Sequence, residues 1–369
     1  MRVLYDGEGL QGPFGGVSHY FAQLIRHLPS DIEVRIAVKK TCNLEFIENP
    51  FNLQQVPDLY HSFLSSAEFR GKWRLWMLAK KLFPWHYPDY EAENRRYLDE
   101  LLEQGEFDVL HLTGAHTYGD AWRKVVGKMP IVITVHDLIP EIIQCNKRVE
   151  VGRRELLGAA ARVIAVSENS KRDLIRLYGI DEKKVSVIYH GGPVAECRRS
   201  KGEYLLFVGG RRGYKNWDWM VAALVPLLKD GMRLVCTGLP FSRWERRYLR
   251  RLEVADCVEQ RMVSAAEFPS LFSSASAFIY PSRYEGFGLP ILDAWAAGCP
   301  VVLSRASCFP EIAGAAAEYF DLGNALSLRE AIFRAMRREC VNRGLKRLHR
   351  FSWDRCADET AEVYRRALE

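Results

Sequence analysis

The chain has 369 residues, a formal net charge of +6 and 48% hydrophobic residues, enough for two globular domains with substantial cores. This charge is too small to indicate nucleic-acid binding and no nucleic-acid-binding motif occurs, so we expect no nucleic acid as a partner. Nine cysteines without a C-x-x-C pair are typical of buried thiols in a reducing compartment, not of a disulfide or zinc framework.

The N-terminal sequence MRVLYDGEG lacks the apolar stretch of a signal peptide. No run approaches the roughly 20 apolar residues that span a membrane. We therefore expect a cytoplasmic location, with peripheral contact to the cytoplasmic membrane face left open.

Two series of short β-branched runs alternate with helical patterns, which predicts an α/β fold with parallel sheets covered on both faces. The first series of predicted strands covers residues 3–5, 33–38, 109–112, 131–135, 163–166 and 185–189. The second covers 204–208, 233–237, 277–280 and 301–303. Between them, residues 189–203 contain three glycines and a proline without periodicity, so we expect a linker there. The sequence thus predicts domains over 1–192 and 193–350, and a separate terminal helix over 351–369.

The first predicted strand leads into Gly7, Gly9 and Gly12, which spell the dinucleotide-binding pattern G-x-G-x-x-G. That pattern predicts an NAD(P)-dependent oxidoreductase. Pro13 and further glycines delay the following helix, however, and the second strand is followed by Lys39 and Lys40 instead of an acidic ribose ligand.

A second glycine pair, Gly15 and Gly16, directly precedes the helical pattern VSHYFAQLIRHL. Glycines at a helix N-terminus let a phosphate approach backbone N–H groups closely. The alternative is a surface loop without a ligand.

Residues 69–90 interrupt the alternation with a stretch rich in Trp, Leu, Lys and Arg. Its basic residues are Arg70, Lys72, Arg74, Lys80 and Lys81, and no acidic residue precedes Asp89. Such a stretch can lie on an anionic lipid surface. The alternative is a helix packed on its own domain with a solvated cationic edge.

In the second series, the strand in LLFVGGRRGYKNW is followed by Arg211, Arg212 and Lys215. Ligands of open α/β sheets bind at the carboxyl ends of the strands, and these cations suit a diphosphate. Solvated loop cations are the alternative.

Another strand and turn, in YPSRYEGFGLPILDAWAAGCPVVLS, present Glu285 before a helix that begins near Pro290 and carries Asp293. Two carboxylates at one donor-rich turn can hold sugar hydroxyls. The alternative is that they only cap the helix and balance its dipole.

Over nearly its whole length, the sequence resembles the retaining nucleotide-sugar glycosyltransferases of family 4, which have the GT-B fold of two Rossmann-like domains facing a cleft. The resemblance rests on TVHDLIPE, RVIAVSENSKRDLIRLYGI, FVGGRRGYKNW, YPSRYEGFGLPILDAWAAGCPVV and FSWDRCADETAEVY. It implies an acceptor-binding domain over 1–192, a nucleotide-sugar-binding domain over 193–350, and a terminal helix that returns to the first domain.

The resemblance also implies roles for single residues of the donor site. Glu285 matches the first Glu of the E-x7-E region, which holds the donor sugar, and Asp293 stands where the second Glu, the ribose ligand, is usual. The turn of Gly286, Phe287, Gly288 and Leu289 would offer backbone N–H groups to sugar and phosphate.

Lys215 matches the phosphate-binding Lys. Gly210 stands where an Arg is usual, so either Arg211 or Arg212 would take that Arg's role. In the first domain, His136 matches the histidine near the reacting centre. Gly15 and Gly16 match the glycine loop that faces the donor phosphates.

The expected activity is therefore transfer of a hexose from a nucleoside diphosphate to a hydroxyl of a glycan or lipid-linked glycan, with GDP-mannose as the expected donor. The resemblance implies retained anomeric configuration, no metal and no cofactor. The residues also leave two alternatives open, the oxidoreductase and a non-catalytic sugar-binding or regulatory subunit.

Overall fold

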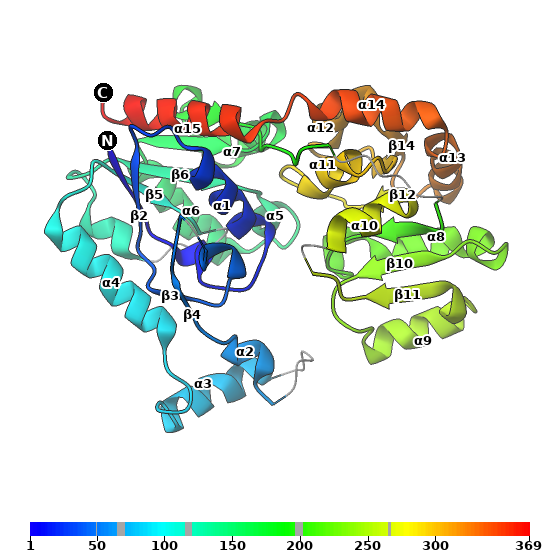
Figure 1. The fold of residues 1–369 in the computed structure, drawn as a ribbon, viewed down its shortest axis with the longest axis horizontal. Helices are drawn as coiled ribbons and strands as arrows, with labels where there is room; N and C mark the ends of the chain where they lie inside the picture. The colour runs from blue at the N-terminus through cyan, green and yellow to red at the C-terminus, as the bar shows by residue number, and fades with distance from the viewer. Residues whose placement is uncertain (49, 65–70, 115–119, 196–201, 265–266) are drawn as a thin grey trace. The chain divides into compact units, whose positions relative to one another are not determined.

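The computed structural model describes residues 1–48, 50–64, 71–114, 120–195, 202–264 and 267–369, which fold into two compact units (Figure 1). Unit 1 comprises Met1–Val166, Ser170–Ile188 and Trp353–Glu369. Unit 2 comprises Ser167–Asn169 and Tyr189–Ser352. The sequence predicted the corresponding domain boundaries at 192/193 and 350/351. Part of the predicted linker, residues 196–201, lies outside the described residues.

Unit 1 is built on a six-stranded sheet in the order β2-β1-β5-β6-β7-β8, and every neighbouring pair is parallel. Its strands are β1 (Arg2–Tyr5), β2 (Glu33–Ile36), β5 (Val109–Leu112), β6 (Ile131–Val135), β7 (Arg162–Ala165) and β8 (Val185–Val187). A small parallel pair, β3 (Lys40–Thr41) and β4 (Gln54–Gln55), lies apart from this sheet. Strands buried on both faces explain the nearly continuous apolar runs of the sequence.

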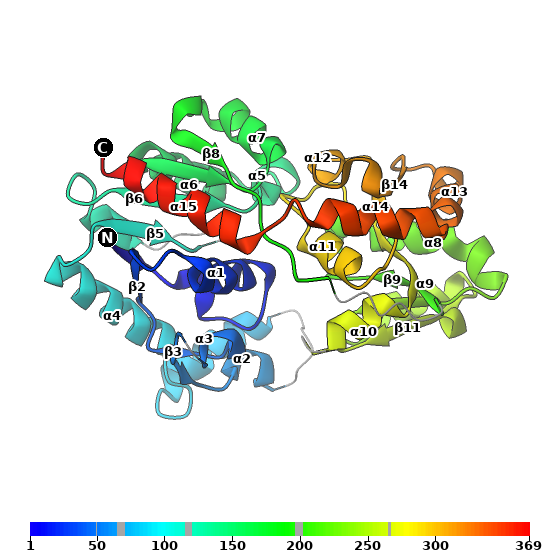
Figure 2. The same cartoon turned by 45° about the horizontal axis from the view of Figure 1, so that its top comes forward.

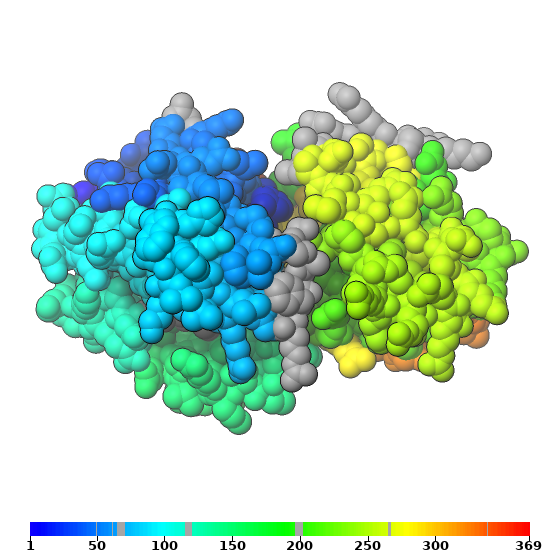
Figure 3. All heavy atoms as spheres, turned by 90° about the horizontal axis from the view of Figure 1, so that it is seen from below, coloured from blue at the N-terminus to red at the C-terminus, as the bar shows by residue number. Residues whose placement is uncertain are grey.

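The helices of unit 1 are α1 (Gly16–His27), α2 (Leu59–Ser62), α3 (Lys72–Leu82), α4 (Tyr90–Gln104), α5 (Ile139–Ile142), α6 (Lys147–Ala159), α7 (Glu168–Tyr178) and α15 (Trp353–Ala367). The blue to light-blue atoms of α2 and α3 lie on the face of the unit seen in Figure 3. None of the helices in the described ranges is both long and apolar enough to cross a bilayer.

Helix α15 brings the C-terminal end of the chain to α1, beside which it packs (Figure 2). Its Tyr364 hydroxyl lies 2.5 Å from the Tyr5 hydroxyl of β1 and 2.6 Å from His111 Nδ1 of β5. His111 Nε2 lies 2.9 Å from Thr134 Oγ1 of β6. Because all four side chains are buried, this hydrogen-bonded chain ties the terminal helix to the core of unit 1.

Unit 2 also has a six-stranded parallel sheet, in the order β11-β10-β9-β12-β13-β14. Its strands are β9 (Tyr204–Phe207), β10 (Leu234–Thr237), β11 (Val258–Arg261), β12 (Ala275–Tyr280), β13 (Val301–Ser304) and β14 (Glu318–Phe320). The strand order is that of a doubly wound dinucleotide-binding sheet, and it reverses between β9 and β12. Loops after these two strands therefore lie at the position where such sheets bind ligands.

The helices of unit 2 are α8 (Trp217–Lys229), α9 (Arg243–Arg251), α10 (Phe268–Ser273), α11 (Leu289–Ala296), α12 (Phe309–Ala313), α13 (Ala325–Ala335) and α14 (Arg338–Leu348). Helices α8 and α13 pack together over a core that includes Trp217, Met220 and Leu328, each fully buried. Burying these apolar side chains stabilises the sheet, and the candidate site lies in the loops at the carboxyl ends of its central strands.

All ten predicted strands form, and the predicted parallel α/β architecture is confirmed. The two-residue strands β3 and β4 were missed, since each is too short to carry a pattern. Strands β11 and β14 were missed too. Both lie at an edge of the sheet of unit 2 and are mostly half-buried, so their sequences VEQR and EYF lack a continuous apolar run.

Candidate functional site

The loop after β9 is shaped by residues with positive φ. Gly209 has φ +117°, and its N–H donates to Thr237 Oγ1 at 3.1 Å. The loop then forms a single 3₁₀ turn over Gly213–Lys215 and ends at Asn216, whose φ of 58° an asparagine tolerates. This turn places Lys215 directly before α8.

Lys215 reaches the loop after the neighbouring strand β12. Its Nζ lies 2.7 Å from Glu285 Oε1 and 3.0 Å from the Tyr280 hydroxyl, which accepts a hydrogen bond from it. The ion pair is largely enclosed, with 16% of the Lys215 side chain and 10% of the Glu285 side chain exposed. The structure therefore brings together the predicted phosphate ligand and the predicted sugar ligand.

Tyr280 completes this cluster, although no sequence motif indicated a role for it. Burial, and then the neighbouring Glu285 carboxylate, raise the pKa of Tyr280 well above its usual value. The hydroxyl therefore stays protonated at neutral pH, and the Tyr280 ring also faces the Lys215 ammonium at 4.9 Å.

The Glu285 backbone is fixed by Ser307, which sequence reasoning also missed. The Glu285 N–H donates to Ser307 Oγ at 2.9 Å, and the Ser307 hydroxyl donates to the Glu285 carbonyl. Ser307 itself has φ 53° and follows β13, so no short motif links it to Glu285. This double hydrogen bond holds the position from which the Glu285 side chain meets Lys215.

The predicted glycine turn leads into α11. Phe287 is 3% exposed, with its ring centroid 4.4 Å from that of His190, so its side chain packs inside unit 2 and offers no contact to a ligand. Gly288 has φ +97°, and a Cβ there would lie 3.1 Å from Ile291 Cδ1 and 3.3 Å from the Phe309 ring. The turn of Gly286, Phe287, Gly288 and Leu289 is thus closely packed, and glycine is required at its tightest point.

Helix α11 begins at Leu289, one residue earlier than the sequence predicted, with Pro290 in its first turn. Asp293 is therefore the fifth residue of α11 and lies just beyond the first turn, half-buried. It shares the helix that the glycine turn introduces.

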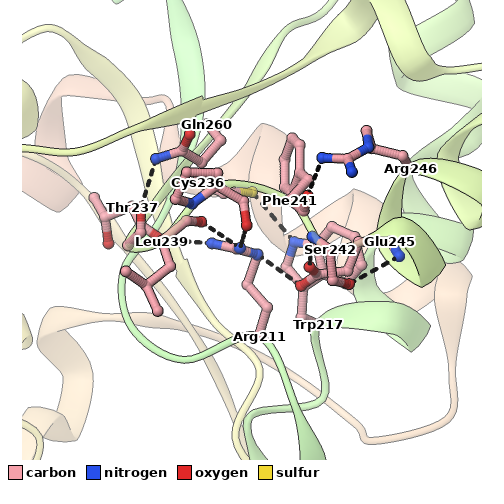
Figure 4. Close-up of polar contacts among 12 residues, drawn as sticks. Arg211, Trp217, Cys236, Thr237, Leu239, Phe241, Ser242, Glu245, Arg246 and Gln260 are labelled. Carbon is pink, nitrogen blue, oxygen red and sulfur yellow. Dashed lines mark hydrogen bonds and ion pairs between the residues drawn. The ribbon is translucent and has the colours of Figure 1, made fainter. Parts of the chain in front are cut away.

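Arg211 is held by protein partners (Figure 4). Its Nε donates to Glu245 Oε1 at 2.8 Å, and its other nitrogens donate to the carbonyls of Thr237, at 3.0 Å, and Leu239. Only 7% of the Arg211 side chain and 4% of the Glu245 side chain are exposed. Burial opposes ionisation of Glu245, but hydrogen bonds from Arg211 and Ser242 outweigh it and lower the pKa of this carboxyl.

Arg212 differs from its neighbour, because its side chain is exposed and its backbone is extended, with φ −120° and ψ 158°. The residue immediately precedes the turn that carries Lys215. Of the two arginines between which the sequence could not decide, Arg212 is the one accessible to a ligand.

In unit 1, two of the three glycines that spell the dinucleotide-binding pattern have structural reasons of their own. Gly7 has φ +70°, and a Cβ there would lie 2.2 Å from Val38 Cγ2. A Cβ on Gly9 would lie 2.2 Å from the Thr113 carbonyl oxygen, whereas one on Gly12 would meet nothing within 4 Å. Close packing of the loop after β1 therefore accounts for Gly7 and Gly9 without a dinucleotide.

Gly15 and Gly16 lie at the N-terminus of α1, where the sequence placed them. The Gly15 N–H donates to Ser18 Oγ at 3.0 Å, and the Ser18 hydroxyl donates back to the Gly15 carbonyl. Gly16 is exposed, and a Cβ on it would meet nothing within 4 Å. The backbone at Gly16 is thus open to a ligand.

His136 follows β6 and is 8% exposed, with edge-on ring contacts to Tyr20 at 5.0 Å and Phe21 at 5.6 Å. The segment after it is fixed by Arg153, whose guanidinium donates to the Asp137 carbonyl at 2.8 Å and pairs with Glu141 Oε1 at 3.1 Å. Both side chains of this pair are almost fully buried. Sequence reasoning missed the pair, because neither residue stands out in its helix.

Within the described part of the chain, no group of three or more His, Cys, Asp or Glu side chains is placed to hold a metal ion.

Comparison with known proteins supports the same division of the chain. Residues 14–195 match the model of Glycosyltransferase Family 4, and residues 202–338 match that of Glycosyl transferases group 1. The chain is 25% identical to O-antigen chain mannosyltransferase B of Escherichia coli over 99% of this chain and 100% of the relative. It is 29% identical to a D-inositol 3-phosphate glycosyltransferase of Kineococcus radiotolerans over 59% of this chain and 60% of the relative.

Among solved structures, HepE of Anabaena, solved in complex with UDP and glucose, matches with a TM-score of 0.69 at 15% identity, and the match covers 98% of each chain. This likeness shows the fold, which is GT-B as the sequence predicted. Unit 1, with the Family 4 match, and unit 2, with the group 1 match, are thus two domains of glycosyltransferase families, and the chain is a glycosyltransferase with the GT-B fold.

Proposed function

We propose that this protein transfers a hexose from a nucleoside diphosphate to a hydroxyl of a glycan or lipid-linked glycan, with retention of the anomeric configuration. The observation that carries the proposal is the Lys215–Glu285 pair, at 2.7 Å, in the loops that follow β9 and β12. These strands meet where the strand order of unit 2 reverses, which is where doubly wound sheets bind nucleotides.

On the donor side, Lys215 and Arg212 supply positive charge for the diphosphate, and Glu285 accepts hydrogen bonds from sugar hydroxyls. The turn of Gly286, Phe287, Gly288 and Leu289 adds backbone N–H groups at the start of α11, where the helix dipole favours an anion. Asp293, on the same helix, binds the ribose. Arg211 is a positioning residue, because its guanidinium is committed to Glu245 and to backbone carbonyls.

In the reaction, the bond between the anomeric carbon and the diphosphate oxygen breaks while the acceptor oxygen forms a bond to that carbon on the same face. The departing phosphate takes the acceptor proton. Fixed cations stabilise the charge that develops on the leaving group, so we propose that no divalent metal and no cofactor is needed. In unit 1, we assign His136 to orienting the sugar and Gly15 and Gly16 to phosphate contact.

The donor is proposed to be GDP-mannose, with support from the mannosyltransferase named among the relatives. We also propose that the transfer takes place in the synthesis of a surface polysaccharide or glycoconjugate, with support from the same relative.

A pocket of about 710 Å³ in unit 1 supports the assignment of an acceptor to this unit. Its lining includes Asp6, which follows β1, and Leu112, which ends β5. The strand order of this sheet reverses between these two strands. The pocket lining also includes the aromatic residues Tyr60, Trp76 and Trp122. Aromatic faces pack on the C–H groups of a sugar ring, and nearby carboxylates accept hydrogen bonds from its hydroxyls.

We propose a cytoplasmic location, peripheral on the membrane face, since a lipid-linked acceptor would be presented there.

The test begins with thermal shifts of the full-length protein against GDP, UDP, ADP, their sugars and NADPH. We expect stabilisation by one nucleoside diphosphate and its sugar, and then transfer to a glycan acceptor detected by mass spectrometry, with the anomeric configuration read by NMR. Activity should survive a chelator. Stabilisation by NADPH alone would favour the oxidoreductase, and donor binding without transfer or hydrolysis would favour a non-catalytic subunit.

A further inference from the structure

Helix α3 and the turn after it carry an unusual amount of exposed apolar surface. Six of the 21 large apolar side chains that are exposed in the described part of the chain lie within residues 75–85. We call them the α3 apolar surface, and they are Leu75, Met77, Leu78, Leu82, Phe83 and Trp85. Single exposed apolar residues are ordinary, but several of them within one short segment indicate a contact surface.

The inner side of α3 fixes which way this surface points. Trp76 is 6% exposed, with its ring 5.3 Å from those of both Phe63 and Tyr87. Leu75, Leu78 and Leu82 follow one another at helical spacings of three and four residues, so they share another side of the helix. With Trp76 anchored, these leucines are held outward, at exposures of 45%, 52% and 53%.

The basic residues of α3 separate into two kinds. Lys72 is fully buried, and Lys80 Nζ pairs with Asp89 Oδ1 at 2.9 Å, with 15% of the Lys80 side chain exposed. Arg74 and Lys81 are exposed, and their spacing of seven residues places them on the same outer side of the helix. Of the basic residues suggested by the sequence, these two remain for an anionic surface, while Arg70 lies outside the described residues.

We propose that the α3 apolar surface, together with Arg74 and Lys81, docks on an anionic lipid bilayer. The leucines would enter the boundary between head groups and acyl chains, while the two cations meet lipid phosphates and Trp85, 78% exposed, lies at the interface. A second copy of the chain fits less well, because a two-fold contact would bring the Arg74 and Lys81 charges of both copies together.

The lipid contact would explain the proposed location at the membrane. It rests on the proposed function only in assuming a lipid-linked acceptor in that membrane. Lipid binding is measured without donor or acceptor. A failure of the lipid proposal is therefore distinguishable from a failure of the catalytic one.

The experiment is co-flotation of the full-length protein with vesicles of phosphatidylcholine alone or mixed with phosphatidylglycerol. We expect binding to the mixed vesicles only. The double variant Arg74→Gln/Lys81→Gln should weaken binding about 25-fold, because each basic residue at an anionic surface contributes a factor of about five. Leu78→Ser/Leu82→Ser should weaken binding as well, since these side chains supply the apolar burial.

Two control variants test whether lipid binding depends on this surface and not on positive charge or exposed apolar side chains anywhere on the protein. Lys80→Gln removes a paired cation, and Leu326→Ser/Phe333→Ser removes two side chains of α13 that are 59% and 53% exposed. Both should bind mixed vesicles like the unmodified protein, and circular dichroism should show all variants folded. The proposal would be overturned if the α3 variants bound mixed vesicles as well as the unmodified protein, or if the protein did not prefer mixed vesicles. It would also be overturned if sedimentation showed a dimer that the α3 variants abolish.

Discussion

The Lys215 ammonium and the Glu285 carboxylate are ion-paired at 2.7 Å although 70 residues separate them in the chain. Each comes from the loop after a different strand, and the Tyr280 hydroxyl accepts a second hydrogen bond from the same ammonium. The proposed phosphate ligand and the proposed sugar ligand are therefore positioned by one another before they meet a donor. Disturbing either should affect donor chemistry more than folding.

Replacement of Glu285 by Gln should keep the side-chain shape and remove its charge. We expect transfer to fall by about 10²–10³-fold, the usual loss when one polar group that stabilises the transition state is removed. Lys215→Ala should weaken binding of the nucleoside diphosphate by about 10–100-fold, because a hydrogen bond to a charged group contributes about 1.5–3 kcal/mol. Transfer rates and calorimetric affinities measure the two effects.

The control for this pair is Lys229→Ala, which removes an ion pair with Glu253 in the same unit. Its side chains are 48% and 77% exposed, so neither transfer nor affinity should change. If Glu285→Gln and Lys215→Ala were as active as this control, the site would be misassigned.

Arg211 and Arg212 are adjacent but should respond oppositely to replacement. Arg211→Ala leaves Glu245 buried without its partner, so we expect a loss of several kcal/mol in the free energy of unfolding, measured by denaturant titration. Arg212→Ala should leave that free energy within about 0.5 kcal/mol of the parent, as for most surface changes, and should weaken binding of the nucleoside diphosphate. The two roles would be exchanged by the reverse result. In that case Arg212→Ala would lose stability, and Arg211→Ala would stay folded but bind the nucleoside diphosphate more weakly.

The sequence was sufficient for the architecture because buried parallel strands have an unmistakable apolar signature, as in IVITV of β6 and VVLS of β13. The prediction failed at β11 and β14, because these edge strands are mostly half-buried and so do not need a continuous apolar run. For the site, the glycine turn and its carboxylate stood out as a dense local motif.

The residues that sequence reasoning missed act across long separations. Tyr280 meets Lys215 across 65 residues and Ser307 meets Glu285 across 22, and a lone Tyr or Ser carries no local signal for such contacts. The choice between Arg211 and Arg212 likewise depends on Glu245, 34 residues away. Local motifs thus predicted which loops matter, and tertiary packing determined the role of each side chain in them.

The glycines of the first loop offer a matched test of packing against ligand contact. Gly9→Ala would force a Cβ to within 2.2 Å of the Thr113 carbonyl oxygen, so we expect a loss of about 1–3 kcal/mol in the free energy of unfolding. Gly16→Ala places its methyl group in open space, so stability should be kept.

Transfer by the Gly16→Ala protein should nevertheless decline, because the added methyl group would keep a donor phosphate from the backbone at the start of α1. Full transfer activity in a stable Gly16→Ala variant would count against phosphate contact there. An unaltered melting temperature for Gly9→Ala would show that the loop after β1 adapts more easily than its packing suggests.

His111 makes the stability of unit 1 depend on pH. Burial, and then the nearby charge of His136, lower the pKa of His111 to about 3, and its ring nitrogens meet the Tyr364 and Thr134 hydroxyls. An unfolded histidine has a pKa of about 6.5, so between these values the unfolded chain binds a proton that the folded chain does not. Stability from this group should be complete above pH 6.5 and should fall below it by up to about 1.4 kcal/mol per pH unit.

The test compares free energies of unfolding from pH 8 to pH 4.5 for the parent, His111→Gln and His349→Gln. We expect His111→Gln to be less stable at pH 8, since it disturbs a buried hydrogen-bonded chain, but to lose less stability on acidification. His349 is exposed at the end of α14, so its replacement should leave the parental slope unchanged. If the free energies of unfolding of the parent and of His111→Gln fell in parallel with pH, another group would govern the loss of stability in acid. Protonation of His111 would then not destabilise the hydrogen-bonded side chains from Tyr5 to Thr134.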